Sequence, residues 1–260
     1  MFFLHLTRRL RPTRLAALAL GLALALAPAA AMARDLYMVS VGITNAKGEA
    51  VLKATAKDAR DMAAWGRAQV GKLGINVFVN TFTDSNATKA NILNAIKNLR
   101  SRVKPADIVI FYDSSHGGLN KAGEFRMIAY DGALSFKEIC EAFKGVAGTK
   151  VAIFDACHSG EAVTSAYGAD LVVFSACRET ELSFDGPATG NSQYTKHFLA
   201  GIKGKADYNK DHAVTFAEAA RYAANRLNEF NKGRAANKQQ HSMYSLPTGV
   251  AETLFISRMR

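Results

Sequence analysis

Short apolar runs rich in β-branched residues alternate with stretches of helical periodicity along most of the chain. This alternation is typical of βαβ units, in which helices cover both faces of a parallel sheet. The pattern therefore predicts an α/β domain with a mostly parallel six-stranded sheet. The expected strands cover residues 36–43, 76–82, 107–112, 151–154, 171–176 and 253–256.

Helical periodicity fills the intervals between these strands. A helix over 53–70 would place Val70 on its inner side with the apolar residues before it. The next helix is expected to begin after a cap at Asn86 or Thr88 and to stop before Pro105. Further predictions are a hairpin over 124–130, helices over 136–146, 193–202 and 215–230, and a mobile polar loop over 231–248.

The first 33 residues differ from the rest of the chain. Four arginines and no acidic residue precede an apolar run of Leu and Ala over 15–28, and Ala31-Met32-Ala33 follows. A basic start, a short apolar middle and small residues at a cleavage point are typical of an export signal. We therefore predict a signal peptide over 1–33, a single domain over 34–260, and export to a periplasm or out of the cell. No later segment is apolar enough to span a membrane.

The charge balance is basic, with 33 Lys and Arg against 22 Asp and Glu. Removal of the four leader arginines leaves 29 basic residues against the same 22 acidic ones, a net charge of +7. The basic residues are scattered along helix faces and loops, without the interleaved aromatic residues of nucleic-acid grooves. We therefore expect no nucleic-acid partner.

Three cysteines are an odd number, so an exported chain of this kind cannot complete a disulfide framework. Cys140 falls in a helical pattern and Cys177 ends an apolar run, which favours buried packing roles. The sequence leaves a Cys140–Cys177 disulfide open. Cys157 differs from both because it lies in a polar turn.

Two successive predicted strands end in polar turns that contain glycine. One turn reads Asp113-Ser114-Ser115-His116-Gly117-Gly118, and the other reads Asp155-Ala156-Cys157-His158-Ser159-Gly160. The carboxyl ends of parallel strands lie at one edge of a sheet, where sites form. If the strands are neighbours, we expect His116 and Cys157 to meet there.

Such a pair has a chemical use. A thiol near its ordinary pKa is mostly protonated at neutral pH, so a nucleophilic cysteine needs a base. His116 would take the proton of Cys157 and later give it to a leaving amine. The N–H groups of Gly117 and Cys157 are the expected oxyanion hole, since glycine permits close backbone approach. A buried packing cysteine beside a loop histidine is the alternative.

The residues of both turns resemble those of a known family. The segment 155–160 is similar to the D-[SA]-C-H-S-G nucleophile motif of metacaspases, and Ser115-His116-Gly117 resembles the histidine motif of the caspase clan. Segments 52–58, 173–182 and 193–199 resemble other parts of the clan, so the resemblance covers most of 36–256. It implies a caspase-like three-layer sandwich and a cysteine endopeptidase that acts on a protein or peptide without a required cofactor.

The resemblance also implies a substrate preference. Metacaspases cleave after Arg or Lys, and the acidic residues of their specificity pocket fall on Asp58 and Asp155 of this chain. Two converging carboxylates repel each other unless a cation lies between them, which favours a basic ligand. The alternative for Asp58 is an acid that complements a helix dipole, and for Asp155 a purely structural role.

The chain departs from the family pattern at three positions. Metacaspases usually have Phe and Gly where this chain has Asp113 and Ser115, and many carry a further cysteine at the position of Thr55. Asp113 is expected to put a charge near the site, and Ser115 removes a flexible glycine. Either change would weaken the activity or retune His116.

The same preference indicates whether the enzyme can cleave its own chain. No Lys or Arg lies between Cys157 and Arg178, the stretch in which caspases separate their two subunits. An enzyme specific for basic residues cannot cut there. We therefore predict a single-chain enzyme.

The segment 207–218 has the spacing of a calcium-binding EF-hand loop, but His212 stands where glycine usually makes the sharp turn. The alternative is an ordinary acidic connection between helices. The calcium candidates are Asp207, Asn209, Asp211 and Glu218.

Two classes of function follow from the sequence. The first is an endopeptidase that cleaves after Arg or Lys through a Cys157/His116 dyad. The second is a catalytically weak or inactive caspase-fold module that binds basic peptides or an envelope partner. A flavodoxin-like nucleotide binder is a third reading, but the chain lacks a G-x-G-x-x-G or P-loop pattern. The oligomeric state and the natural substrate do not follow from the sequence.

Overall fold

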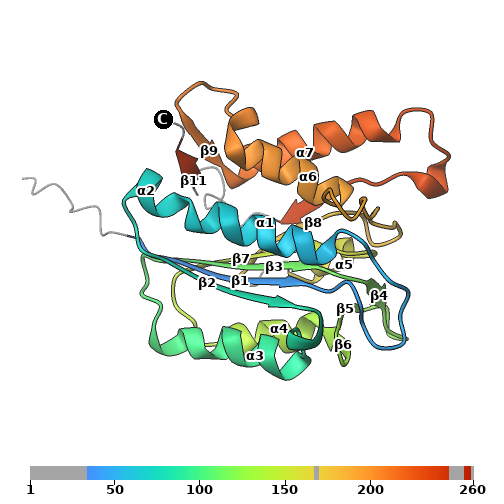
Figure 1. Cartoon of the computed structure of the whole chain (residues 1–260), viewed down its shortest axis with the longest axis horizontal. Coiled ribbons are helices and arrows are strands. Elements are labelled where there is room, and N and C mark those ends of the chain that lie inside the picture. Colours follow the sequence, from blue (N-terminus) through green and yellow to red (C-terminus); the bar gives the residue numbers. More distant parts are fainter. Residues whose placement is uncertain (1–33, 167–169, 246–254, 259–260) are drawn as a thin grey trace, which may run out of the picture. The chain divides into compact units, whose positions relative to one another are not determined.

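A computed structural model describes residues 34–166, 170–245 and 255–258, and its central feature is a six-stranded sheet (Figure 1). The strand order is β10-β8-β7-β3-β1-β2. All neighbours pair in parallel except β10, which pairs antiparallel with β8. The strands are β1 (Leu36–Gly42), β2 (Val77–Thr83), β3 (Ile108–Ser114), β7 (Thr149–Asp155), β8 (Val172–Ser175) and β10 (Met243–Ser245).

Helices cover both faces of this sheet (Figure 1). One face packs on α1 (Thr55–Arg67), α6 (Gln193–Ala200) and α7 (Phe216–Asn231), and the other on α3 (Lys89–Lys97), α4 (Phe136–Phe143) and α5 (Gly160–Ser165). Because β1 and β3 are buried along their whole length, they carry continuous apolar runs instead of an alternating pattern. The predicted three-layer α/β architecture is confirmed.

The helix ends follow from local sequence. The side chain of Thr88 caps α3, as predicted, and capping boxes begin α4 and α7. The prediction for Val70 is wrong, because this side chain is 50% exposed. The helix is interrupted at Ala68 and continues as the short α2 (Gln69–Leu73), so the periodicity of α1 does not extend to Val70.

Three predicted elements differ in the structure. The expected hairpin over 124–130 is part of a three-stranded antiparallel sheet, β4 (Gly117–Leu119), β5 (Phe125–Ala129) and β6 (Gly132–Ser135). The last strand, β11 (Phe255–Arg258), pairs with β9 (Ala213–Thr215) and not with the central sheet. The sixth strand of the sheet is instead β10, which comes from the segment predicted as a mobile loop.

Residues 231–245 are therefore ordered, although their composition is polar. Gln240 is completely buried there, because amide side chains replace apolar packing with hydrogen bonds. Short helical turns complete the chain at Asp84–Asn86, Asn98–Ser101, Gly201–Lys205 and Ala236–Lys238. The predicted signal peptide lies outside the described residues. None of the described helices has both the length and the apolar character that crossing a membrane requires.

Candidate active site

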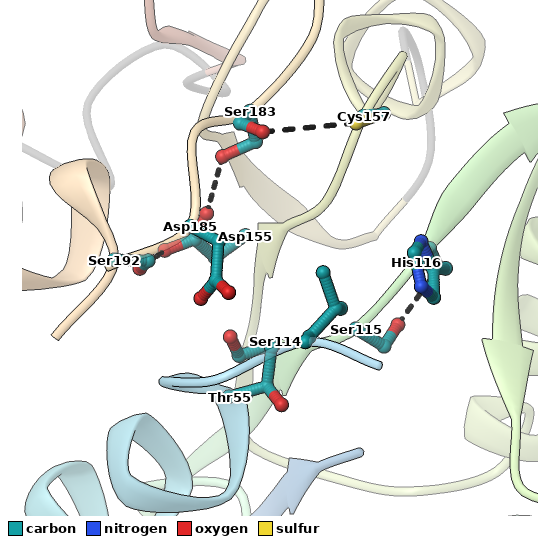
Figure 2. Close-up of a pocket in the computed structure, with 10 residues that line it drawn as sticks. Thr55, Ser114, Ser115, His116, Asp155, Cys157, Ser183, Asp185 and Ser192 are labelled. Atoms are coloured by element: carbon teal, nitrogen blue, oxygen red, sulfur yellow. Dashed lines mark hydrogen bonds between the residues drawn. The ribbon is translucent and has the colours of Figure 1, made fainter. Parts of the chain in front are cut away.

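The turns that carry His116 and Cys157 lie side by side at the carboxyl edge of the sheet. Strands β3 and β7 are neighbours, and their last residues, Ser114 and Asp155, are paired in register. The Ser115 N–H donates to the Asp155 carbonyl at 3.3 Å, which ties the two turns together. They border one pocket (Figure 2), whose lining is Leu52, Thr55, Ser114, Ser115, His116, Asp155, Cys157, Ser183, Asp185 and Ser192.

The imidazole of His116 is oriented by a backbone carbonyl. Its Nε2 lies 2.7 Å from the carbonyl oxygen of Ala50, in the loop before α1. A carbonyl oxygen only accepts hydrogen bonds, so Nε2 carries the proton and a neutral ring keeps its lone pair on Nδ1. The base in this arrangement is therefore Nδ1. The role of Ala50 was not predicted, because a main-chain carbonyl leaves no trace in residue type.

The thiol of Cys157 is half-buried and lies 3.8 Å from the carbonyl oxygen of Ser183. Burial raises the pKa of this thiol, and the nearby charge of Asp155 raises it further. The neutral thiol is thus the resting form. Within the described chain, no hydrogen bond joins this thiol to His116. Such bonds are commonly loose in ligand-free sites and tighten around a substrate.

Gly117 is required where the two turns touch. A Cβ atom at this position would lie 2.4 Å from the carbonyl oxygen of Cys157 and 2.8 Å from the Cβ of Ala156. Only glycine allows this approach. The structure thus brings Gly117 beside Cys157, the two residues whose N–H groups form the predicted oxyanion hole.

The turn after the nucleophile is held by the loop that follows β8. His158 has a positive φ of 62°, its N–H donates to the Glu181 carbonyl at 2.9 Å, and its Nδ1 lies 2.7 Å from the Glu179 carbonyl. A left-handed conformation at a residue other than glycine costs energy and persists where its surroundings enforce it. A Cβ at Gly160 would lie 2.5 Å from the Glu179 nitrogen, so this contact is a close one.

Asp155 forms a wall of the pocket and is only 3% exposed. One of its carboxylate oxygens accepts from the Ser183 hydroxyl at 2.6 Å. The other accepts from the hydroxyl of Thr195 at 2.7 Å, from the N–H of Thr195 at 3.1 Å and from the hydroxyl of Ser192. Burial raises the pKa of Asp155, and these hydrogen bonds lower it in part.

Asp58, on α1, lies behind this wall and is completely buried. Its carboxylate accepts from the Ser114 hydroxyl at 2.9 Å and from the Ser192 N–H at 3.2 Å. Burial and then the charge of Asp155 raise the pKa of Asp58 to about 7. The two predicted carboxylates therefore converge on Ser192, but Asp155 lines the pocket and Asp58 does not.

A third carboxylate at the pocket, that of Asp185, was not expected. Its oxygens accept from the N–H groups of Lys53 at 2.6 Å, Ala54 at 3.0 Å and Gly186 at 2.8 Å. It thereby fixes the chain entering α1 against the loop after β8. An Asp before Gly-Pro looks like an ordinary turn residue, so sequence offers no signal for this contact.

Three residues depart from the family pattern. Asp113 and Ser115 contact each other, and Thr55 lines the pocket. Asp113 is completely buried and is not part of the pocket lining. Burial raises its pKa well above the usual range, which disfavours the charge that the sequence led us to expect near the site. The Ser115 hydroxyl lies 3.0 Å from the Asp113 carboxyl and 2.9 Å from the carbonyl oxygen of His116. Thr55 lines the pocket, with its hydroxyl 3.2 Å from that of Thr44.

None of the three cysteines forms a disulfide bond. Cys140, Cys157 and Cys177 are all free thiols, so the open possibility of a Cys140–Cys177 disulfide is not realised. Cys177 is buried, with its sulfur 3.3 Å from the Ala156 carbonyl oxygen.

In the predicted calcium loop, His212 has a φ of 63°, the left-handed geometry that glycine usually supplies. The acidic side chains bond locally: Asp207 and Asp211 accept from the N–H groups of His212 and Ala213, and Glu218 belongs to the capping box of α7. The part of the chain that the structure describes contains no group of three or more His, Cys, Asp or Glu arranged to hold a metal. Calcium binding stays a prediction.

Comparison with solved structures shows the same fold in three distant proteins. A protein of Geobacter sulfurreducens matches with a TM-score of 0.65 at 18% identity, over 86% of this chain and 97% of that one. Caspase-1 of Spodoptera frugiperda matches with a TM-score of 0.57 at 11% identity, over 87% and 91%. The Drosophila initiator caspase Dronc matches with a TM-score of 0.54 at 12% identity, over 82% and 79%.

The sequence itself matches a family, although no curated protein matches it. The family model for the caspase domain covers residues 39–250. This span includes both turns at the sheet edge and all six strands of the central sheet except the first residues of β1. The resemblance to the caspase clan is confirmed, and a protein substrate is implied. The chain belongs to the caspase domain family, whose members are cysteine peptidases.

Proposed function

We propose that this protein is a cysteine endopeptidase that cleaves after Arg or Lys, with Cys157 as nucleophile and His116 as base. The observation that carries the proposal is the pairing of β3 with β7, which sets both turns around one pocket. The Ala50 carbonyl supports it, because it leaves Nδ1 of His116 free to accept a proton.

The reaction begins when Nδ1 takes the proton from the Cys157 thiol. The thiolate attacks the substrate carbonyl carbon, and the N–H groups of Gly117 and Cys157 receive the negative charge on the oxygen. The imidazolium then protonates the leaving amine, and a thioester remains on Cys157. Water activated by His116 hydrolyses this thioester and restores the free thiol.

Specificity for a basic residue is supported by the carboxylates around the pocket. A cation beside Asp155 offsets the repulsion between Asp155 and Asp58, so a guanidinium or ammonium group stabilises both in their charged forms. An aspartate side chain in the same place would add a third negative charge. Cleavage after Asp is therefore disfavoured.

The test uses matched fluorogenic peptides that end in Arg, Lys or Asp. We expect hydrolysis of the first two by the mature protein, and loss of at least about a thousandfold in Cys157→Ala and His116→Ala. Hydrolysis that survives Cys157→Ala would refute the nucleophile. Hydrolysis only after Asp would refute the basic pocket.

A second candidate is a weakly active or inactive module that binds basic peptides or an envelope partner. It is favoured by one observation, the raised pKa of a thiol whose hydrogen-bond partner is Ser183 and not a base. Binding of an arginyl peptide without any turnover by a correctly folded protein would support this candidate over the peptidase.

We further propose that the mature chain begins near Arg34, that it acts in a periplasm or outside the cell, and that it works as a single chain. The leader composition and the lack of Lys or Arg between Cys157 and Arg178 support this. No cofactor is required in this proposal, so activity should survive a metal chelator. N-terminal sequencing and gel analysis of the protein recovered from the periplasm or the medium test the other three points.

A further inference from the structure

Gln240 occupies an unusual position in the segment 231–241, between α7 and β10. Its side chain is completely buried, and both polar atoms of the side chain form hydrogen bonds with the loop that follows β8. Its Nε2 donates to the Ala176 carbonyl at 3.0 Å and to the Ser183 hydroxyl oxygen at 3.1 Å. Its Oε1 accepts from the Phe184 N–H at 3.1 Å. One side chain thus holds three points of that loop.

The backbone of Gln240 is itself held in place by hydrogen bonds to Asn231. The Asn231 amide at the end of α7 donates to the Gln240 carbonyl at 2.8 Å and accepts from the Gln240 N–H at 2.9 Å. The Arg234 guanidinium lies 4.7 Å from the ring centre of Phe184, and its Nε donates to the Lys238 carbonyl at 2.7 Å. These contacts fix the position from which Gln240 acts.

Ser183 connects Gln240 to the site. A hydroxyl has a single proton, and Ser183 gives it to Asp155 at 2.6 Å, so its oxygen accepts from Gln240. The carbonyl oxygen of the same serine lies 3.8 Å from the Cys157 sulfur. The direction of the Ser183 hydroxyl and the place of its carbonyl therefore both depend on Gln240.

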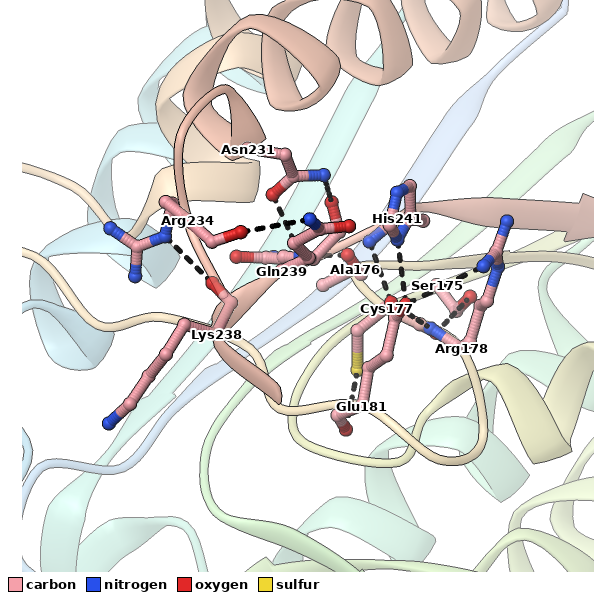
Figure 3. Close-up of polar contacts among 11 residues, drawn as sticks. Ser175, Ala176, Cys177, Arg178, Glu181, Asn231, Arg234, Lys238, Gln239 and His241 are labelled. Carbon is pink, nitrogen blue, oxygen red and sulfur yellow. Dashed lines mark hydrogen bonds and ion pairs between the residues drawn. The ribbon is translucent and has the colours of Figure 1, made fainter. Parts of the chain in front are cut away.

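The next residue holds the same loop at a second point (Figure 3). The His241 N–H donates to the Glu181 carboxylate at 2.7 Å, and its Nδ1 lies 2.6 Å from the other oxygen of that carboxylate. The Glu181 carbonyl accepts from His158, beside the nucleophile. Residues 240 and 241 thus anchor the stretch 181–184 on both sides of Ser183.

We propose that Gln240 is a positioning residue that directs the Ser183 hydroxyl onto Asp155, and so sets the pocket wall for a basic substrate residue and the contact on the Cys157 thiol. The first consequence rests on the proposed peptidase function, and the second does not. Loss of the Gln240 hydrogen bonds weakens substrate binding at the pocket more than it affects proton transfer at His116.

The test compares Gln240→Met, which keeps length and volume but removes the hydrogen bonds, with Gln239→Met. Gln239 is a matched control, since among the described residues its side-chain amide bonds only to the Arg234 carbonyl within the same segment. For Gln240→Met we expect about a tenfold rise in KM for an arginyl peptide with a smaller change in kcat, and wild-type values for the control.

A second readout does not need activity. The rate of Cys157 alkylation by iodoacetamide, followed by peptide mass spectrometry, should rise several-fold in Gln240→Met and stay unchanged in Gln239→Met. That result with an inactive wild type would support the positioning role and reject the peptidase.

Ser183→Ala removes the hydroxyl alone and serves if Gln240→Met does not fold. It should reproduce the rise in KM while keeping the carbonyl contact, so its alkylation rate should stay near that of the wild type. Equal KM and equal alkylation in the Gln240 and Gln239 variants, or a wild-type KM in Ser183→Ala, would overturn the inference.

Discussion

Binding of a basic residue should release a proton from Asp58, and the effect is large enough to measure. The pKa of Asp58 is about 7, because it is buried and faces Asp155. At pH 6 about a tenth of the molecules hold Asp58 ionised, and at pH 8 about nine tenths do. A bound guanidinium favours the ionised pair. The dissociation constant of an arginyl peptide should therefore fall by up to about tenfold from pH 6 to pH 8.

The assay is calorimetric titration of an uncleaved arginyl peptide into the Cys157→Ala variant. Measurements in two buffers of different ionisation enthalpy give the number of protons released, which should approach one half at pH 7. A further His116→Ala substitution removes the other group that exchanges a proton in the proposed mechanism. It should leave the result unchanged.

Asp58→Asn, made in the same Cys157→Ala background, is the decisive control. It keeps an oxygen that can accept from Ser114 but cannot ionise, so proton release should vanish and the affinity should no longer depend on pH between 6 and 8. No proton release in the parent, or the same release in Asp58→Asn, would refute the reasoning.

The same proton affects stability. The folded chain binds it at a pKa of about 7, and the unfolded chain at about 4. The folded state therefore binds more protons across this interval, and the free energy of unfolding rises as the pH falls from about 7 towards 4. Urea unfolding should show a weaker pH dependence in Asp58→Asn.

Three further results are expected. Gly117→Ala should lower kcat by about a hundredfold or more, because its Cβ would clash with the Cys157 carbonyl; wild-type turnover would contradict this contact. Asp113→Asn should keep the activity within about threefold, since burial disfavours a charge at this position and the Asn oxygen can still accept from the Ser115 hydroxyl; a large loss would mean that the carboxyl group itself is needed. Glu218→Ala should lower the free energy of unfolding by about 1 kcal/mol with or without calcium, through loss of the capping box of α7; calcium-dependent stabilisation that Glu218→Ala removes would instead favour a calcium site.

Local sequence determined much of this protein. The buried strands are recognisable because a strand covered on both faces must be apolar throughout. The two polar turns are recognisable because parallel strands present their carboxyl ends at one edge, and there the structure sets the turns that carry His116 and Cys157 around one pocket. The glycine at 117 has a local explanation as well, since no other residue fits the contact between the turns.

Other features were decided only by tertiary structure. The Ala50 carbonyl reaches His116 across 66 positions of the chain, and Asp185 reaches Lys53 across 132. Gln240 holds Ser183 from 57 positions away, in a segment whose composition indicated a loop. Each of these contacts joins polar groups that lie far apart in the sequence, and residue type does not indicate which distant groups will meet. Hydrophobic pattern specifies which surfaces must be buried, whereas the pairing of distant polar groups is selected only when the whole chain has packed.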